Sequence, residues 1–563
     1  MNFVEKIRKQ LQKSIEEALH KAQKAGDLNF ENIPTPINLE VPREKQHGDF
    51  ATNIAMIMAK SARMNPRMVA EKIVQHFDKG SLIQDLQVAG PGFINFTLDH
   101  SWLYEVLPAV QEQDAKYGAS DIGAGKKVQV EFVSANPTGL LHMGNARGAA
   151  LGDTLANLLN MAGYEVTKEF YINDAGNQIE NFAKSLEARY LELLGQEVLF
   201  PEEGYHGQDV IDTMARLIEK DGDKYLQMDR ELRRELLVKY ALQEKLKGIA
   251  TSLENFGVQY DIWFSEQSLH DEGAIEKTLE QLRQNGYIYE NEGALWFKAT
   301  AVGEEKDEVL VRSNGIPTYF AADIAYHKNK FDRQFDWVIN IWGADHHGHV
   351  SRMKNAVKAL GYDQDKLDII LMQLVRLLKG GEIVRMSKRT GQYITLDELV
   401  EEVGKDAARF FFVMRSADSH LDFDLDLAKS QSAENPVYYV QYAHARICSI
   451  LRTAQEAGYK VPETKTEQAP KYNLLTHPAE LALLRKIVDL PDEVARAATA
   501  MEPHRMARYA QDLASLFHSF YTNCRVINDE EELRRARLLL VDDSRIVLRN
   551  VLNWMGLTAP ERM

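Results

Sequence analysis

One histidine in this sequence stands where it could contact a phosphate group. It is His142, within KVQVEFVSANPTGLLHMGNARGAALG at residues 127–152. The β-branched run at 128–133 predicts a strand, the following Pro and Gly predict a turn, and the apolar residues after Asn145 have helical spacing. A helix that begins directly after such a turn directs its unpaired backbone N–H groups at an anion. We therefore expect His142 and Gly144 at a phosphate-binding helix start, where glycine allows close approach.

A lysine in a second stretch could act on the same kind of group. Lys388 lies in VRMSKRTG at residues 384–391, and residues 376–390 contain five Lys/Arg and one Glu. A run of charge is usually only a solvated surface, but the flanking glycines and the first stretch favour a functional loop. An ammonium group there could follow negative charge as it develops on a leaving pyrophosphate.

Together the two stretches resemble the "HIGH" and "KMSKS" signatures of class I aminoacyl-tRNA synthetases. Other segments spread over the whole chain resemble bacterial arginyl-tRNA synthetases in particular: EFVSANPTG, YINDAGNQI, PTYFAADIAYH, IWGADHHGH, NPVYYVQYAHARI and LTAPERM. The sequence departs from the pattern at Asn145, where the last histidine of "HIGH" is more usual. Asparagine donates a hydrogen bond but carries no charge, so the contribution of this position to catalysis is open.

The resemblance implies an arginine–tRNA ligase that uses ATP with Mg²⁺ to form arginyl-adenylate and then charges the terminal ribose of tRNA(Arg). Reactions of this type need positioning and charge stabilisation rather than a covalent nucleophile. The implied catalytic residues are His142, Asn145 and Lys388. The implied ATP contacts are His142, Gly144, Asn145, Asp345, His346, Met386, Ser387 and Lys388.

Selection of arginine over lysine requires planar, bidentate acceptors, because guanidinium is a rigid fork. By motif matching, Glu131 and Asp323 are the acidic candidates, with Tyr319 beside them and Asn136 at the α-amino or carboxylate end. The implied arginine contacts are Glu131, Ser134, Asn136, His142, Tyr319 and Asp323. Alternatively, Glu131 is a buried residue that caps a neighbouring helix.

The segment Asp345-His346-His347 supports a rival interpretation, because it also spells the signature of metal-dependent phosphoesterases. Such hydrolases need further carboxylates that bridge two metals, and the nearest candidates are Asp422, Asp424 and Asp426. We favour a ribose-binding Gly-x-Asp turn and expect no protein-held metal, with Mg²⁺ arriving with ATP. A second rival is a synthetase-like protein that binds tRNA without charging it, although both signature residues are retained here.

Composition excludes several classes of protein. The formal net charge is −16, but residues 196–310 hold 25 Asp/Glu against 13 Lys/Arg, whereas residues 437–563 are nearly neutral. Two cysteines allow no disulfide framework, and no run of apolar residues is long enough for a membrane span. We expect a cytoplasmic protein, a monomer, that does not associate with membranes.

The expected fold class is α/β. Strands that alternate with helical patterns predict a Rossmann-like parallel-sheet catalytic domain, interrupted by a helical insertion, between an N-terminal α+β domain and a C-terminal α-helical bundle. The expected domains are an elbow-binding domain at 1–115, the catalytic domain at 116–375 with an acidic insertion at about 196–310, a stem-contact region at 376–435 and an anticodon-binding bundle at 436–563. The sheet is expected to resume at 309–312.

Two further groups of residues are candidate tRNA contacts. Asn173 and Gln178 follow a predicted strand, where polar residues either form the turn or contact substrate. Tyr438, Tyr442 and Arg446 interleave aromatic and basic groups on a predicted helix. Aromatic faces of helices are more often part of a core than platforms for bases, so this second group stays a weak candidate.

Overall fold

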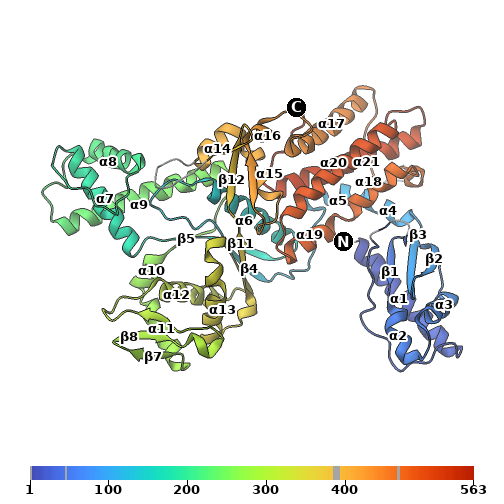
Figure 1. The fold of residues 1–563 in the computed structure, drawn as a ribbon. Helices are drawn as coiled ribbons and strands as arrows, with labels where there is room; N and C mark the ends of the chain where they lie inside the picture. The colour runs from blue at the N-terminus through green and yellow to red at the C-terminus, as the bar shows by residue number, and fades with distance from the viewer. Residues whose placement is uncertain (1–2, 43, 45–46, 385–393, 466–468) are drawn as a thin grey trace.

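The computed structural model describes residues 3–42, 44, 47–384, 394–465 and 469–563. A parallel sheet lies at the centre of the molecule (Figure 1). Helices α7–α9 project from one side of it, and the helices of the carboxyl-terminal part lie on the other side, next to the small N-terminal unit.

The N-terminal unit packs three helices against an antiparallel sheet of order β1–β3–β2. Its elements are α1 (Phe3–Lys24), β1 (Phe50–Thr52), α2 (Ile54–Ala62), α3 (Pro66–His76), β2 (Ile83–Ala89) and β3 (Phe93–Leu98). Ile7, Leu11 and Ile15 of α1 are buried, and their spacing of four residues forms the apolar stripe that a surface helix needs.

Asp49 fastens this unit to the carboxyl-terminal helices. Its carboxylate accepts a hydrogen bond from the Leu98 amide at 2.8 Å and forms an ion pair with Arg485 of α18 (Pro478–Val488). Next in the chain come α4 (Ser101–Tyr104), α5 (Val106–Gln113) and η2 (Asp114–Lys116). The Gln111 amide donates to the buried Asp543 of α21 at 2.7 Å, so the two ends of the chain pack together.

The central sheet has five parallel strands in the order β11–β10–β4–β5–β6. The strands are β4 (Lys127–Glu131), β5 (Glu165–Ile172), β6 (Ile262–Ser265), β10 (Trp337–Gly343) and β11 (Leu367–Met372). Helices α6 (Met143–Met161), α12 (Tyr319–Asp332) and α13 (Val350–Ala359) belong to this layer, with the short η5 (Gln364–Lys366) before β11. The predicted Rossmann-like sheet is confirmed, and its ligand site is expected beyond the carboxyl ends of the strands.

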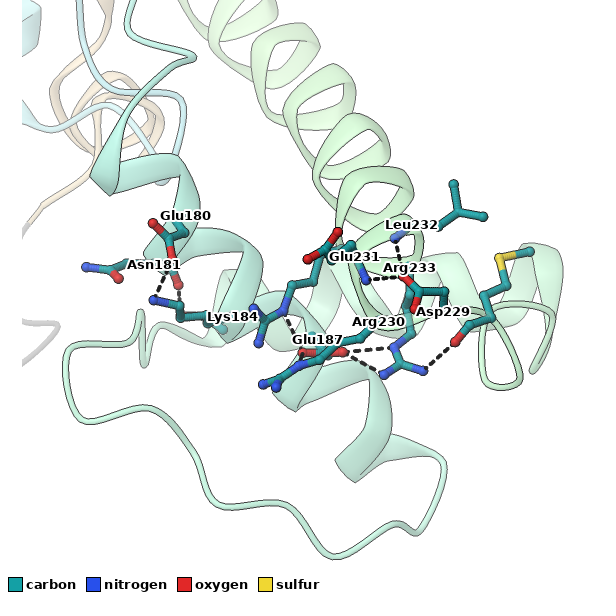
Figure 2. Close-up of polar contacts among 12 residues, drawn as sticks. Glu180, Asn181, Lys184, Glu187, Asp229, Arg230, Glu231, Leu232 and Arg233 are labelled. Carbon is teal, nitrogen blue, oxygen red and sulfur yellow. Dashed lines mark hydrogen bonds and ion pairs between the residues drawn. The ribbon is translucent and has the colours of Figure 1, made fainter. Parts of the chain in front are cut away.

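The projecting module consists of α7 (Asn177–Leu193), α8 (Gln208–Asp221) and α9 (Arg230–Asn255). Glu187 of α7 is buried and accepts hydrogen bonds from Arg233 at 2.7 Å and Arg234 at 2.7 Å, both of α9 (Figure 2). Asp229 caps α9 through the amide of Glu231 at 2.8 Å. This cluster fixes α9 against α7 and makes the module a rigid arm.

The structure differs in two respects from the helical insertion expected at 196–310. β6 lies within that range and pairs with β5 in the central sheet. β9 (Glu308–Val311), where the central sheet was expected to resume, instead belongs to an antiparallel sheet with β7 (Ile288–Asn291) and β8 (Ala294–Phe297). A short apolar run specifies a strand but not its partner, which explains both differences. The same region contains α10 (Glu266–Asp271), α11 (Ala274–Gln284) and η3 (Ala299–Val302).

A third small sheet, of order β13–β12–β14, precedes the carboxyl-terminal helices. Its region contains β12 (Val375–Lys379), β13 (Glu382–Val384), α14 (Leu396–Val403), α15 (Lys405–Val413), β14 (Leu421–Asp424) and α16 (Leu425–Lys429). β13 ends at the last residue before 385–393, and α14 begins just after that segment.

The carboxyl-terminal part is helical, as predicted. It comprises α17 (Pro436–Glu456), η7 (Tyr472–Leu474), α18, α19 (Leu490–Thr499), α20 (His504–Asn523) and α21 (Glu531–Trp554). Cys448 and Cys524 are buried and unbridged. Of the helices in the described residues, none combines the length and apolar character that crossing a membrane requires.

Candidate active site

The turn after β4 is held in a strained conformation. Val133 and Ser134 have φ values of +69° and +42°, a region that disfavours residues with side chains and β-branched ones most of all. The Ser134 hydroxyl donates to Glu131 at 2.8 Å and accepts from the Tyr171 amide at 3.1 Å, so it ties the turn to both β4 and β5. Strain of this kind is concentrated at functional sites, and Asn136 lies exposed just beyond it.

His142 and Asn145 form the N-terminal cap of α6. The His142 Nδ1 accepts from the Gly144 amide at 3.1 Å, and the Asn145 side chain accepts from the His142 amide at 3.1 Å. A neutral His142 therefore carries its proton on Nε2. A Cβ atom at position 144 would lie 3.0 Å from the His142 ring, so glycine makes room for the imidazole. Asn145 makes the cap through its amide oxygen, which needs no charge.

Backbone hydrogen bonds join the first signature segment to residues 394–396, which follow the second signature in the chain. The Leu396 amide donates to the Leu141 carbonyl at 2.9 Å, and the Met143 amide donates to the Ile394 carbonyl at 3.3 Å. The chain therefore returns to the start of α6 immediately after residues 385–393. Met386, Ser387 and Lys388, which carry the second signature, lie outside the described residues.

Asp323 and Glu266 are two carboxylates close enough for the charge of one to raise the pKa of the other. Asp323 is on α12, one turn after Tyr319, and accepts from His349 at 3.1 Å. Glu266 opens α10 and is 4% exposed, with a hydrogen bond to the Tyr171 hydroxyl. Burial, and then the neighbouring charges of Asp323 and Asp174, raise the pKa of Glu266 to about 7. No Lys or Arg in the described part of the chain forms an ion pair with Glu266.

Glu266 was missed in the sequence because it falls within the assumed insertion. The signal was the apolar run Ile262-Trp263-Phe264 with a carboxylate close behind it, which is the pattern of a buried strand that ends at a ligand site. Tyr319 is 47% exposed and lies beside Gly176, which follows β5, and its expected contact with arginine stays a prediction.

Glu131 has a partner that the sequence did not predict. The fully buried ammonium of Lys330 lies 2.5 Å from its carboxylate. Lys330 also donates to the Asn340 side chain at 2.7 Å. The structure thus gives Glu131 a buried counter-charge, and its expected contact with the guanidinium of arginine stays a prediction.

Asp345 and His346 lie in the short helix η4 (Ala344–His349), directly after β10. Their side chains are 82% and 58% exposed, as suits a surface that meets a ligand. In the ranges that the structure describes, no group of three His, Cys, Asp or Glu side chains is arranged to hold a metal ion. The carboxylates of the rival phosphoesterase interpretation have other partners: Asp422 pairs with Arg376, Asp424 caps α16, and Asp426 accepts from the Gly380 amide.

Two acceptors at the end of β5 have no hydrogen-bond partner among the described residues. They are the buried side-chain oxygens of Asn173 and Gln178. The intervening Asp174 is a turn former, because it accepts from the Ser265 hydroxyl at 2.6 Å and the Gln267 amide at 2.9 Å.

The aromatic residues of α17 lie at the surface. Tyr438 and Tyr442 stack with ring centroids 6.2 Å apart, and Tyr442 is 41% exposed. Arg446 lies 4.6 Å from the Tyr521 ring of α20. Tyr442 is therefore exposed, whereas Tyr438 and Arg446 are partly buried.

The parallel sheet, the histidine-capped helix at its carboxyl edge and the return of the chain to that helix at residues 394–396 are the features of a class I aminoacyl-tRNA synthetase. The family model "tRNA synthetases class I (R), catalytic domain" matches residues 106–419. Two further models match on either side, "Arginyl tRNA synthetase N terminal domain" at 9–98 and "DALR anticodon binding domain" at 440–563.

Relatives that match over the full length of the chain identify the amino acid specificity within this class. The chain is 78% identical to the arginine–tRNA ligase of Heliobacterium modesticaldum and 63% identical to that of Moorella thermoacetica, with 100% of both chains covered in each case. The structure of Thermus thermophilus arginyl-tRNA synthetase matches with a TM-score of 0.75 and 25% identity, over 99% of this chain and 100% of that one. The chain belongs to the arginine–tRNA ligase family. Its reaction is the ATP-dependent joining of L-arginine, through arginyl-adenylate, to tRNA(Arg).

Proposed function

We propose that Asp323 and Glu266 hold the guanidinium group of the substrate arginine. The observation that carries this proposal is the buried Glu266 carboxylate, which lacks a cation among the described residues and has a second carboxylate close by. Leaving such groups without a partner is costly, and a planar fork can bind both carboxylates at once. The ammonium of lysine is a point charge and cannot do so.

The remaining arginine contacts follow from the position of this pair. Tyr319, one helical turn before Asp323, is proposed to cover the guanidinium or the side-chain carbons. Ser134, Asn136 and His142 are proposed to hold the α-amino and carboxylate groups. The paired Glu131 is proposed to shape the pocket floor rather than to bind arginine.

We place ATP at the start of α6. The positive end of the helix dipole at this start and an Nε2–H donor on His142 suit phosphate oxygens, and Gly144 and Asn145 keep the imidazole in position. Asp345 and His346 are proposed to contact the ribose. Bound ATP, accompanied by Mg²⁺, supplies the adenylyl group.

Lys388 is proposed to neutralise the leaving pyrophosphate, because only six residues separate it from Ile394, whose carbonyl pairs with Met143. Met386 and Ser387 are proposed as further contacts to ATP. The chemistry assigned to the chain is therefore orientation of two substrates and stabilisation of developing charge, with no covalent intermediate on the protein.

The tRNA is proposed to contact every domain. The orphan acceptors of Asn173 and Gln178 suit the 3′-terminal nucleotides, and the strip formed by Tyr438, Tyr442 and Arg446 suits stacking with anticodon bases. The proposed domain roles are elbow binding for 1–115, catalysis for 116–375, stem contact for 376–435 and anticodon binding for 436–563. We also propose that the protein acts as a cytoplasmic monomer.

Glu266→Gln tests the arginine pocket. The variant should raise the KM for arginine at least tenfold in aminoacylation while the KM for ATP changes little. Glu272→Gln, on an exposed carboxylate just after the same helix, is the control. An unchanged arginine KM in Glu266→Gln would remove this residue from the pocket.

A further inference from the structure

Arg409 is a buried cation at which four parts of the chain meet. It lies on α15 and has no exposed surface. Its guanidinium donates to Asp153 of α6 at 2.6 Å, to the Met555 carbonyl at 2.8 Å and to the Phe256 carbonyl at 3.1 Å. One side chain on α15 thus contacts α6 of the central sheet layer, the end of α9 in the projecting module and the end of α21 in the carboxyl-terminal helices.

The partners of Arg409 explain why a charge is tolerated there. Met555 is the C-cap residue of α21, and Phe256 is the C-cap residue of α9. Helix carboxyl ends carry partial negative charge, and Asp153 adds a full one. Because a buried guanidinium is costly without such partners, the contacts persist only while α6, α9 and α21 keep their relative positions.

Helix α6 connects this junction to the proposed ATP site. His142 caps the first turn of α6, and Asp153 lies on the same unbroken helix about three turns later. Asp153 is also fixed by Lys168 of β5 at 2.6 Å. A direct hydrogen bond also joins α6 to α21, because the Asn157 side chain donates to the Trp554 carbonyl at 3.1 Å. A shift at the end of α21 would therefore move α6 and its capped start.

We propose that Arg409 is a positioning residue that couples the anticodon-binding helices to the start of α6, so that occupancy of the anticodon site changes turnover at the catalytic site. The inference rests on the catalytic role proposed above for His142. The inference goes beyond the proposed role of His142, because it assigns a function to Arg409, which is not among the residues proposed to bind arginine, ATP or tRNA.

Two glycines allow a matched test of this coupling. Gly556 follows α21 and Gly458 follows α17, both with left-handed φ values, +72° and +85°. In each case the next amide closes the helix, from Leu557 to Leu552 at 3.0 Å and from Tyr459 to Ala454 at 2.9 Å. A Cβ atom at 556 would lie 2.4 Å from the Arg409 guanidinium, whereas one at 458 would have no atom within 4 Å. Alanine therefore strains both backbones but displaces Arg409 only at 556.

The experiment compares aminoacylation of a tRNA(Arg) transcript with that of the same transcript carrying a replaced anticodon. We expect wild type to show a higher kcat with the intact transcript. In Gly556→Ala this kcat ratio should fall by about tenfold, a typical size for coupling between sites, while the KM for the intact transcript stays within about threefold. Gly458→Ala should retain the wild-type ratio.

Arg409→Lys, which keeps the charge but loses the fork, should behave as Gly556→Ala does. If either variant fails to fold, Asn157→Ala removes the direct α6–α21 hydrogen bond and should lower the ratio in the same direction. Equal kcat for both transcripts in wild type, or an equal loss of kcat for both in Gly556→Ala, would overturn the coupling. Turnover unaffected in His142→Gln would instead overturn the role of His142 alone.

Discussion

The Lys330 ammonium lies 2.5 Å from the Glu131 carboxylate, although 199 residues separate the two in the chain. Both side chains are buried, and Lys330 also lies 4.3 Å from the centre of the Tyr326 ring. The pair joins α12 to β4. It therefore fixes the helix that presents Tyr319 and Asp323.

Removal of one member of this pair should cost more than removal of both. Lys330→Met leaves a buried carboxylate uncompensated, so we expect unfolding free energy to fall by about 3–5 kcal/mol. The double variant Glu131→Gln, Lys330→Met should recover part of that loss. Urea denaturation measures both effects. If the folded double variant loses arginine binding, Glu131 is itself a ligand.

Asp323→Asn should weaken arginine binding without a comparable effect on turnover. A hydrogen bond to a charged group contributes about 1.5–3 kcal/mol, so the KM for arginine should rise between about tenfold and a hundredfold. The control is Asp332→Asn on the same helix, whose carboxylate pairs with Lys328 at the surface. Steady-state aminoacylation at saturating ATP and tRNA gives the values, and an arginine KM equal to that of the control would exclude Asp323.

Arginine affinity should depend on pH through Glu266. Burial raises the pKa of this carboxyl to about 7 in the free protein, and only the ionised form attracts a guanidinium. The ionised fraction falls as pH falls through 7, so the dissociation constant for arginine should increase about tenfold between pH 8 and pH 6. Calorimetric titration over that range measures it. A slope that persists in Glu266→Gln would assign the titration to another group.

Lys388→Ala should lower turnover far more than arginine binding. The lost ammonium is proposed to act only as charge develops on pyrophosphate, and removal of one such interaction typically costs about 10²–10³ in rate. We expect the KM for arginine to stay within about threefold. Lys379→Ala, whose exposed ammonium pairs with Glu402 at 3.4 Å, controls for charge in the same region. Reduced arginine affinity with normal turnover would contradict the assignment.

Some features of the site could be predicted because they are local. His142, Gly144 and Asn145 are neighbours on one helix start, so the glycine and the capping residues are visible in the sequence. Tyr319 and Asp323 are four residues apart, and a helical pattern is enough to place them on one face. The continuous burial of β4 follows in the same way from a strand covered on both faces.

Other features depended on packing between distant segments. Glu266 lies at the carboxyl edge of the central sheet only because β6 pairs with β5. The strand β9 pairs with β8 instead of joining the central sheet, although its residues are as apolar as those of a central strand. Asp49 meets Arg485 across 436 residues. No local sequence pattern predicts these strand pairings and ion pairs, because they depend on how whole helices and strands pack together.

The sequence by itself determined the class of protein, the parallel sheet and the two signature segments, since strand, turn and cap are properties of adjacent residues. Tertiary structure decided that Lys330 forms an ion pair with Glu131 and that Glu266 lies near Asp323. It also decided that Arg409 joins α6 to the ends of α9 and α21. The physical reason is that each of these contacts joins side chains from different elements, and only the packing of the folded chain brings such elements together.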